Sequence, residues 1–334
     1  MGAPNDHYTP PTRGIFTLLP SALTPYAELM RLHQPAGCYF YYCHYVIGLS
    51  FAACVTPSPP TPSRLVIQAI YFMAWVVILR GAMCTWNDNA DQDLDRQVAR
   101  TRLRPIARGA VTTVQGHVFV LLQLVVGGIV LQVLSPSCLV YAATTTLMGL
   151  VYPFCKRVTH FPQVFLGLGF SLAIFMTGPA LKVDFILPHP SNDDDGRRRR
   201  LAALCLYAAS VLYTILVDTL YAYQDREDDI KAGVGSLAVR LGRKSPKLIF
   251  SLMAAAQVVF LVAVGILSRF SAIYFVGSCG ITAIILVSMI SLVNLTDPAS
   301  CAWWFGPGSC LLGASMAIGM LGEYAARQVL SAYF

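Results

Sequence analysis

Nine long apolar stretches restrict the folds that this chain can adopt. Crossing the hydrocarbon core of a bilayer takes about 20 mainly apolar residues. Stretches of that kind are Ala36–Val55, Leu65–Trp86, His117–Leu134, Cys138–Phe154, Gln163–Leu181, Leu201–Tyr221, Leu248–Ser268, Phe270–Thr296 and Cys301–Gly322. We therefore predict an all-α integral membrane protein with nine transmembrane helices and the lipid bilayer as its surroundings.

The composition excludes several other classes of protein. Of the 334 residues, 56% are hydrophobic and only 12% are charged, whereas an average soluble domain is about 25% charged. The net charge of +7 comes from basic residues in short segments between apolar stretches, so we predict no nucleic-acid partner. The ten cysteines include no CxxC pair, which argues against a disulfide framework and a zinc site.

The domain organisation follows from the same pattern. We predict that residues 1–24 form a short polar tail, which lacks the features of a cleaved signal peptide, and that residues 25–334 form one transmembrane domain. Most Lys and Arg residues lie on the side of the N-terminus and of the loops after the even-numbered stretches, which predicts a cytosolic location for that side. The run Arg197–Arg200 lies on the other side and argues against this orientation.

Acidic residues gather in two segments, each at the end of an apolar stretch. Nine of the 17 Asp and Glu residues lie there. The first segment carries Asp88, Asp91, Asp93 and Asp95, and the second carries Asp218, Asp225, Glu227, Asp228 and Asp229. A charge at the centre of a membrane helix costs roughly 2.5–3.5 kcal/mol. These acidic side chains therefore require a compensating cation or a water-filled cavity.

The spacing of these oxygen ligands favours a hard cation. Asn87, Asp91 and Asp95 are each four residues apart, as are Asp225 and Asp229, so each set is predicted to share one helix face. Asp218, seven residues before Asp225, returns to nearly the same face. Carboxylate oxygens suit Mg²⁺, which completes its shell with water and phosphate oxygens.

Basic residues accompany both acidic segments. They are Arg96, Arg100, Arg102, Arg104 and Arg108 after the first, Lys156 and Arg157 at the end of the fourth stretch, and Arg226, Lys231 and Arg240 after the second. Acidic residues, a metal ion and basic residues are expected together in a site that binds a diphosphate and then releases it.

These segments resemble the motifs of the UbiA-type intramembrane prenyltransferases, which join isoprenoid diphosphates to aromatic or quinone acceptors. Residues 87–95 fit that family's NDxxDxxxD motif, residues 225–229 its DxxxD motif, and residues 152–156 its YxxxK element. Arg31 to Gly37 looks like the entry to the family's first helix, and Arg104-Pro105 like its RP segment. The resemblance runs from about Pro25 to Tyr324. It implies nine transmembrane helices around a central cavity, with both Asp-rich motifs on the cytosolic side.

The resemblance, together with the spacing, suggests a role for each candidate residue. Asn87, Asp91, Asp225 and Asp229 would hold Mg²⁺ ions that bridge the diphosphate, with Asp88 and Asp95 as supporting ligands. Lys156, Tyr152 and Arg104 would contact the diphosphate, Asp218 would orient or deprotonate the acceptor hydroxyl, and Arg31 would bind an acceptor carboxylate. The aromatic residues between Tyr39 and Tyr45 would either stabilise an allylic cation or serve in packing.

The branches of the family that appear closest are fungal enzymes that farnesylate aromatic polyketides in meroterpenoid pathways and 4-hydroxybenzoate polyprenyltransferases. The favoured function is Mg²⁺-dependent farnesyl transfer from a prenyl diphosphate donor to an aromatic phenolic acceptor in the endoplasmic reticulum. The alternative is quinone biosynthesis in the mitochondrial inner membrane. His33-Gln34 replaces the family's usual Asp-Lys and leaves the acceptor open. A transporter is the rival from another class, but it predicts acids in the middle of a span.

Overall fold

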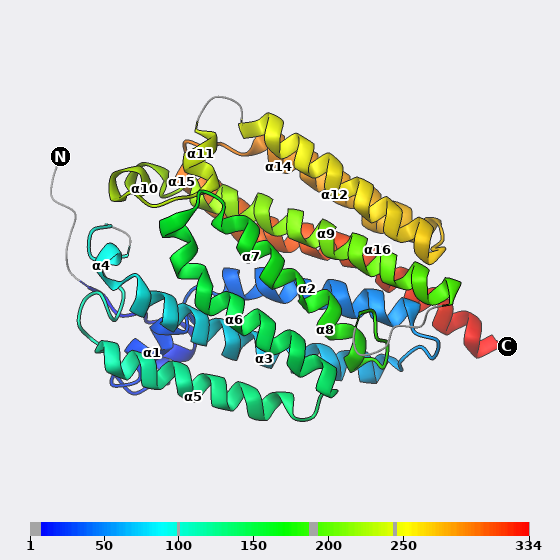
Figure 1. Cartoon of the computed structure of the whole chain (residues 1–334), viewed down its shortest axis with the longest axis horizontal. Helices are drawn as coiled ribbons and strands as arrows, with labels where there is room; N and C mark the ends of the chain where they lie inside the picture. Colours follow the sequence, from blue (N-terminus) through cyan, green and yellow to red (C-terminus); the bar gives the residue numbers. More distant parts are fainter. Residues whose placement is uncertain (1–7, 99–100, 187–192, 243–245, 334) are drawn as a thin grey trace. The chain divides into compact units, whose positions relative to one another are not determined.

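The computed structural model describes residues 8–98, 101–186, 193–242 and 246–333, and within these residues the regular secondary structure is helical throughout (Figure 1). Nine of the described helical segments are long and apolar enough to cross a membrane. They are α2 (Ala36–Val55), α3 (Pro62–Ala90), α5 (Thr113–Leu131), α6 (Pro136–Val158), α7 with α8 (Pro162–Ser171 and Ala173–Ala180), α9 (Asp194–Ala222), α12 (Pro246–Ser268), α13 with α14 (Ala272–Tyr274 and Ile281–Leu292), and α15 with α16 (Pro298–Trp303 and Ser309–Tyr333), of which Pro298–Val329 forms the last span.

Each of these segments coincides with one predicted stretch, so the prediction of an all-α, multi-pass membrane protein is confirmed. The helices extend past several apolar stretches. For example, α3 continues through Trp86 to Ala90, and α9 begins at Asp194, where Asp193 accepts a hydrogen bond from the Gly196 N–H (2.7 Å). Polar residues at the ends of a span satisfy backbone groups that the apolar part cannot.

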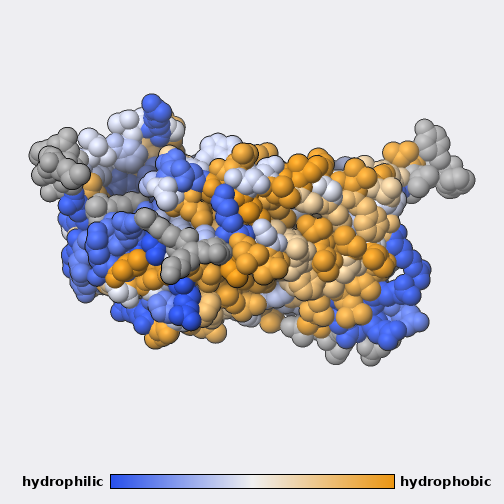
Figure 2. All heavy atoms as spheres, turned by 90° about the horizontal axis from the view of Figure 1, so that it is seen from above, coloured by the Kyte–Doolittle hydropathy of each residue, from blue (hydrophilic) through white to orange (hydrophobic). Residues whose placement is uncertain are grey.

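Outward-facing apolar side chains mark the surfaces that meet lipid. On α5 the exposed residues Val118, Leu121, Leu122 and Val125 recur at the three- and four-residue spacing of one helix face. On α12, Leu252, Val259 and Ile266 are exposed in the same way. Figure 2 shows broad areas of hydrophobic side chains on the face that it presents. In water such areas would drive association, but in a bilayer they are the natural surface.

The chain forms two compact units. Unit 1 comprises Met1–Pro35 and Val77–Gly128, and unit 2 comprises Ala36–Val76 and Ile129–Phe334, so the boundary falls within α3 and within α5. The short helices η1 (Gly14–Thr17), α1 (Thr24–Leu29) and α4 (Gln92–Asp95) belong to unit 1, whereas α10 (Arg226–Ala232) and α11 (Leu237–Leu241) belong to unit 2. The first acidic segment therefore lies in unit 1 and the second in unit 2.

In unit 2, α9 packs against α7 and α12, and α2 packs against α8 and α16. Aromatic residues fill the contacts between these helices: the Tyr41 ring stacks on Phe170 with centroids 4.1 Å apart, and Phe40 lies edge-on to Tyr213 at 5.2 Å. The buried His44 on α2 places its Nε2 atom 2.7 Å from the Thr214 hydroxyl on α9. This polar contact joins α2 to α9.

Candidate active site

The first acidic segment lies where the membrane helix α3 breaks. The helix ends at Ala90, Asp91 has a non-helical backbone (φ −101°, ψ 7°), and the four-residue helix α4 follows. The N–H groups of Asp91 and Asp95 still donate to the carbonyls of Asn87 and Asp91 (2.9 and 2.8 Å). The helix on which the four-residue spacing of Asn87, Asp91 and Asp95 is interpreted is therefore interrupted at Asp91, because closely spaced Asn and Asp side chains favour caps and turns over the helix interior.

The second acidic segment repeats this local structure. Helix α9 ends at Ala222, Asp225 has φ −104° and ψ 5°, and α10 begins at Arg226. The Asp229 N–H donates to the Asp225 carbonyl at 2.8 Å. The predicted helical continuity from Asp218 to Asp225 is also wrong, because Tyr223 and Gln224 form a turn. Asp91 and Asp225 thus occupy equivalent positions, in a backbone region where many active-site residues are found.

Three of the four acids in the first segment point inward. Asp88, Asp91 and Asp95 are 1%, 5% and 6% exposed. Asp93 is instead an exposed side chain that pairs with Arg96 at 2.7 Å. A solvated acidic loop would expose all four, so this burial distinguishes the segment from an ordinary surface loop.

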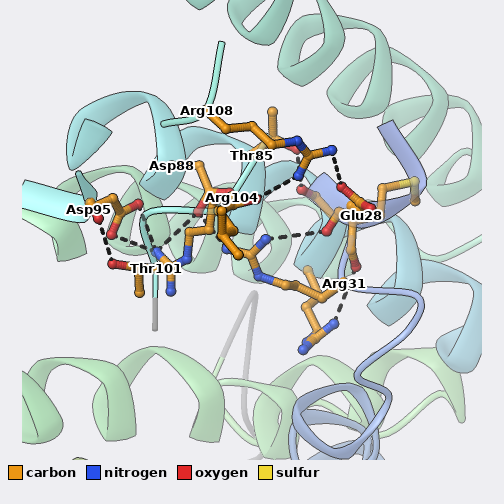
Figure 3. Close-up of polar contacts among 12 residues, drawn as sticks. Glu28, Arg31, Thr85, Asp88, Asp95, Thr101, Arg104 and Arg108 are labelled. Carbon is orange, nitrogen blue, oxygen red and sulfur yellow. Dashed lines mark hydrogen bonds and ion pairs between the residues drawn. The ribbon is translucent and has the colours of Figure 1, made fainter. Parts of the chain in front are cut away.

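Two arginines from other parts of unit 1 neutralise these buried acids (Figure 3). Arg31 Nη2 lies 2.5 Å from Asp88 Oδ1. Arg104 Nη1 contacts both carboxylate oxygens of Asp95 (3.0 and 2.9 Å) and lies 3.3 Å from Asp88 Oδ1. The structure therefore brings Arg31, Arg104, Asp88 and Asp95 together. Arg31 and Asp88 are 57 residues apart in the sequence.

The buried cluster retains capacity for a further cation. The second oxygen of Asp88, Oδ2, is buried and has no hydrogen-bond partner among the described residues. Burial raises the pKa of Asp95, and the nearby carboxylates of Asp88 and Asp91 raise it further, against the opposing effect of Arg104. Oxygen donors that repel one another fit a hard divalent ion such as Mg²⁺. As they stand, the described residues contain no group of three His, Cys, Asp or Glu side chains arranged to hold a metal.

The loop that carries Arg104 is fastened to the N-terminal part of the chain. Arg108 pairs with the buried Glu28 of α1 (2.6 Å) and stacks over the Tyr8 ring at 3.7 Å, while the Tyr8 hydroxyl donates to Glu28. Thr101 Oγ1 donates to the Asp95 carbonyl at 3.0 Å. Glu28 is not among the residues predicted from the sequence, although an acid within the largely apolar α1 indicates that it needs a partner. The predicted basic residue Arg100 lies outside the described residues.

In unit 2, the end of α6 meets the loop after α10. Lys156 Nζ lies 5.2 Å from the centroid of the Tyr152 ring, within the range of a cation–π contact. The Gly235 N–H donates to the Lys156 carbonyl at 2.9 Å, and the Leu237 N–H donates to Gln163 Oε1 of α7 at 3.1 Å. These backbone contacts hold the DxxxD segment beside the YxxxK element.

The acids of the second segment are less deeply buried than those of the first. Asp218, Asp225, Asp228 and Asp229 are all half-buried, Glu227 is exposed, and Asp228 pairs with Lys231 at 3.3 Å. Lys156, near the end of α6, interacts electrostatically with Asp218 of α9.

The contacts of Arg31 and Arg104 bear on the roles predicted for these two residues. Arg31, predicted to bind the acceptor, and Arg104, predicted to bind diphosphate, both contact acids of the first segment. Asn87 is half-buried at the last turn of α3. Of the predicted aromatic run, Phe40, Tyr41 and Tyr45 are buried against protein groups, and Tyr45 accepts a hydrogen bond from Trp75 Nε1 at 2.9 Å. This arrangement favours the packing interpretation of the run.

Comparisons with known proteins place these observations in context. A sequence model of the UbiA prenyltransferase family matches residues 43–318. Among characterised relatives, the prenyltransferase ascA of Acremonium egyptiacum is 38% identical over 292 residues, which cover 86% of this chain and 82% of the relative. The DMOA farnesyltransferase nvfB of Aspergillus novofumigatus is 37% identical over 227 residues, which cover 68% of each chain. A UbiA homologue from Archaeoglobus fulgidus, solved with GPP and Mg²⁺, has the same fold: the TM-score is 0.60 at 14% identity, over 89% of this chain and 99% of that one.

Proposed function

This chain belongs to the UbiA prenyltransferase family, and we propose that it transfers a farnesyl group from a prenyl diphosphate to a phenolic, polyketide-type aromatic acceptor in a Mg²⁺-dependent reaction of meroterpenoid biosynthesis. The observation that carries the proposal is the equivalent placement of Asp91 and Asp225, each between a membrane helix and a short helix. We further propose that the enzyme resides in the endoplasmic reticulum with its site facing the cytosol.

The relatives support the finer parts of this proposal. The name of nvfB describes a farnesyltransferase, which favours farnesyl over other isoprenoids, and the Archaeoglobus structure contains Mg²⁺ with a prenyl diphosphate. The alternative is a 4-hydroxybenzoate polyprenyltransferase of quinone biosynthesis. A transporter is disfavoured because the acids lie at helix ends, with the buried first-segment acids paired to arginines.

The residues of the chain suggest how the reaction proceeds. Mg²⁺, held in our proposal by Asn87, Asp88, Asp91, Asp95, Asp225 and Asp229, would offset the negative charge that develops on the departing diphosphate. Lys156, Tyr152 and Arg104 donate hydrogen bonds to diphosphate oxygens. The allylic C–O bond breaks, and its electron pair leaves with the diphosphate.

The acceptor then supplies the new bond. An electron pair of the phenol ring attacks the allylic carbon, and the ring carbon afterwards releases its proton. Asp218, which interacts electrostatically with Lys156, orients the phenol hydroxyl or takes its proton. Arg31 binds a carboxylate of the acceptor, which would link the acceptor to the first acidic segment through Asp88. Apolar helices exclude water that would otherwise quench the allylic cation.

The test is a product assay on microsomes that contain this chain. Mg²⁺ is supplied with geranyl, farnesyl or geranylgeranyl diphosphate and with phenolic acids of the orsellinic and 4-hydroxybenzoic types, and products are identified by mass. A farnesylated orsellinic-type acid is the expected product. Product from 4-hydroxybenzoate alone would refute the meroterpenoid assignment in favour of quinone biosynthesis, and no diphosphate release with any donor would refute prenyl transfer.

Replacing Lys156 with alanine tests its assignment to the diphosphate. Loss of a charge-assisted contact of this kind costs about 1.5–3 kcal/mol, which corresponds to about a 10- to 100-fold loss of kcat/KM for the prenyl diphosphate. Steady-state kinetics with varied donor concentration measure this loss. The exposed neighbour Arg157 provides a matched control, since Arg157→Ala should leave kcat/KM unchanged. Unaltered kinetics in Lys156→Ala would remove Lys156 from the site.

A further inference from the structure

The turn that ends α1 has an arginine at the left-handed position where helix ends usually have glycine. The Leu32 N–H donates to the Ala27 carbonyl (3.1 Å) and the Arg31 N–H to the Glu28 carbonyl (2.8 Å). This is the Schellman pattern of helix termination, in which the residue with left-handed backbone is usually glycine. Here that residue is Arg31, with φ 58°. A side chain with a Cβ atom is unfavourable in this conformation.

The side chain of Arg31 makes two contacts that glycine could not make. Its Nη1 donates to the Glu28 carbonyl (3.2 Å) and its Nη2 to Asp88 Oδ1 (2.5 Å) (Figure 3). Glycine would satisfy the turn but would leave the buried Asp88 carboxylate without this partner. Backbone strain of this kind persists where surrounding contacts enforce it and is concentrated at functional sites.

Arg80 enforces the strained turn. This arginine lies within the membrane helix α3, where a charged side chain is costly and usually functional. Its Nη1 donates to the Met30 carbonyl (3.3 Å) and its Nη2 to the Gln34 carbonyl (3.2 Å), one on each side of Arg31. Helix α3 therefore holds the turn twice, through Arg80 on its backbone and through Asp88 on the Arg31 side chain.

The neighbouring histidine leaves this arrangement undisturbed. His33 lies in the same turn, and its pKa is lowered by burial and by the nearby guanidinium groups of Arg31 and Arg80, against the opposing effect of Glu28. The lowered pKa favours the uncharged imidazole of His33 beside the guanidinium groups of Arg31 and Arg80.

We propose that Arg80 is a positioning residue for the first acidic segment. By fixing residues 30–34, it keeps the Arg31 guanidinium on Oδ1 of Asp88 and so orients the carboxylate whose Oδ2 is left unpartnered. The inference rests on the proposed function, in which Asp88 helps to hold Mg²⁺. Groups that orient metal ligands typically contribute 10- to 100-fold to metal affinity.

The experiment measures metal binding separately from catalysis. The purified full-length chain in detergent is titrated with Mn²⁺ in the presence of inorganic diphosphate, and free Mn²⁺ is followed by electron paramagnetic resonance. In Arg80→Gln, the Kd for Mn²⁺ and the Mg²⁺ concentration for half-maximal activity should both rise about 10- to 100-fold, while kcat at saturating Mg²⁺ stays within a few-fold of wild type. Arg80→Lys should recover part of the affinity. Arg64→Gln, near the start of the same helix, is the matched control and should change neither value.

A double variant tests whether Arg80 acts through Arg31. Arg31→Gly should show the same affinity loss, with the fall in Tm from the lost Asp88 partner partly offset because glycine suits the left-handed turn. Arg80→Gln with Arg31→Gly should bind Mn²⁺ no more weakly than Arg31→Gly alone, since residues that act through one contact are not additive. An additive loss in the double variant would overturn the proposal, as would an Arg80→Gln variant with lowered Tm and unchanged Mn²⁺ affinity.

Failure of the proposed function gives a different result. A wild-type chain that binds Mn²⁺ with diphosphate but prenylates no acceptor would refute the proposed reaction and leave the positioning role intact. A wild-type chain that turns over while Arg80→Gln keeps wild-type Mn²⁺ affinity would refute the positioning role alone.

Discussion

Asp225→Ala and Asp91→Ala are each expected to abolish Mg²⁺-dependent prenyl transfer while the chain still inserts into the membrane. Each aspartate directly precedes the short helix that follows a membrane span. Because diphosphate departure depends on neutralising the leaving charge, losing either residue should lower kcat by about 10³-fold or more. The measurement is product formation per unit of membrane-inserted enzyme, with the amount of enzyme determined by immunoblot.

Each acidic segment contains its own control residue. Asp93 and Asp228 lie close to Asp91 and Asp225 in sequence. The exposed Asp93 pairs with Arg96, and the half-buried Asp228 pairs with Lys231, each three residues away. Surface pairs of this kind contribute about 0.2–1 kcal/mol or less, so Asp93→Ala and Asp228→Ala should retain activity. Wild-type turnover in Asp91→Ala or Asp225→Ala would rule out a site that uses both segments.

Gly235→Ala is expected to lower activity by about 10²-fold, the usual consequence of displacing a catalytic group by about 1 Å. A Cβ atom at this position would lie 2.2 Å from the Thr159 carbonyl oxygen and 3.1 Å from that of Lys156. Both are backbone atoms, so the loop after α10 must move away from the end of α6. The YxxxK element and the DxxxD segment would then lose their register, which steady-state kinetics would detect.

Two other glycines separate this clash from general effects of substitution. Gly233 has φ 69° and no atoms near its Cβ position, so Gly233→Ala tests backbone strain, worth about 1 kcal/mol. Gly128 lies in α5 with open space around it, and Gly128→Ala should be neutral or slightly stabilising. Activity of Gly235→Ala equal to that of Gly128→Ala would show that the contact between the loop and α6 is irrelevant to turnover.

Sequence patterns predicted the membrane helices closely, because lipid selects for long apolar stretches whatever their neighbours are. The second membrane helix, α3, shows where this prediction falls short. Its predicted end at Trp86 is four residues before its end at Ala90 in the structure. Hydropathy marks the apolar part of a span, whereas the end of the helix depends on where polar side chains begin to compete for the backbone.

The sequence by itself determined the family, the nine membrane helices and the two acidic segments, since each depends on residue types within a short stretch. Only the tertiary structure decided that Asp88 and Asp95 are buried with Arg31 and Arg104 while Asp93 faces outward. It also decided the pairing of Glu28 with Arg108, 80 residues away. Such contacts join residues distant in sequence, and a buried charge is stable only where packing supplies its partner. Local patterns therefore located the acids, and packing decided which of them can act together.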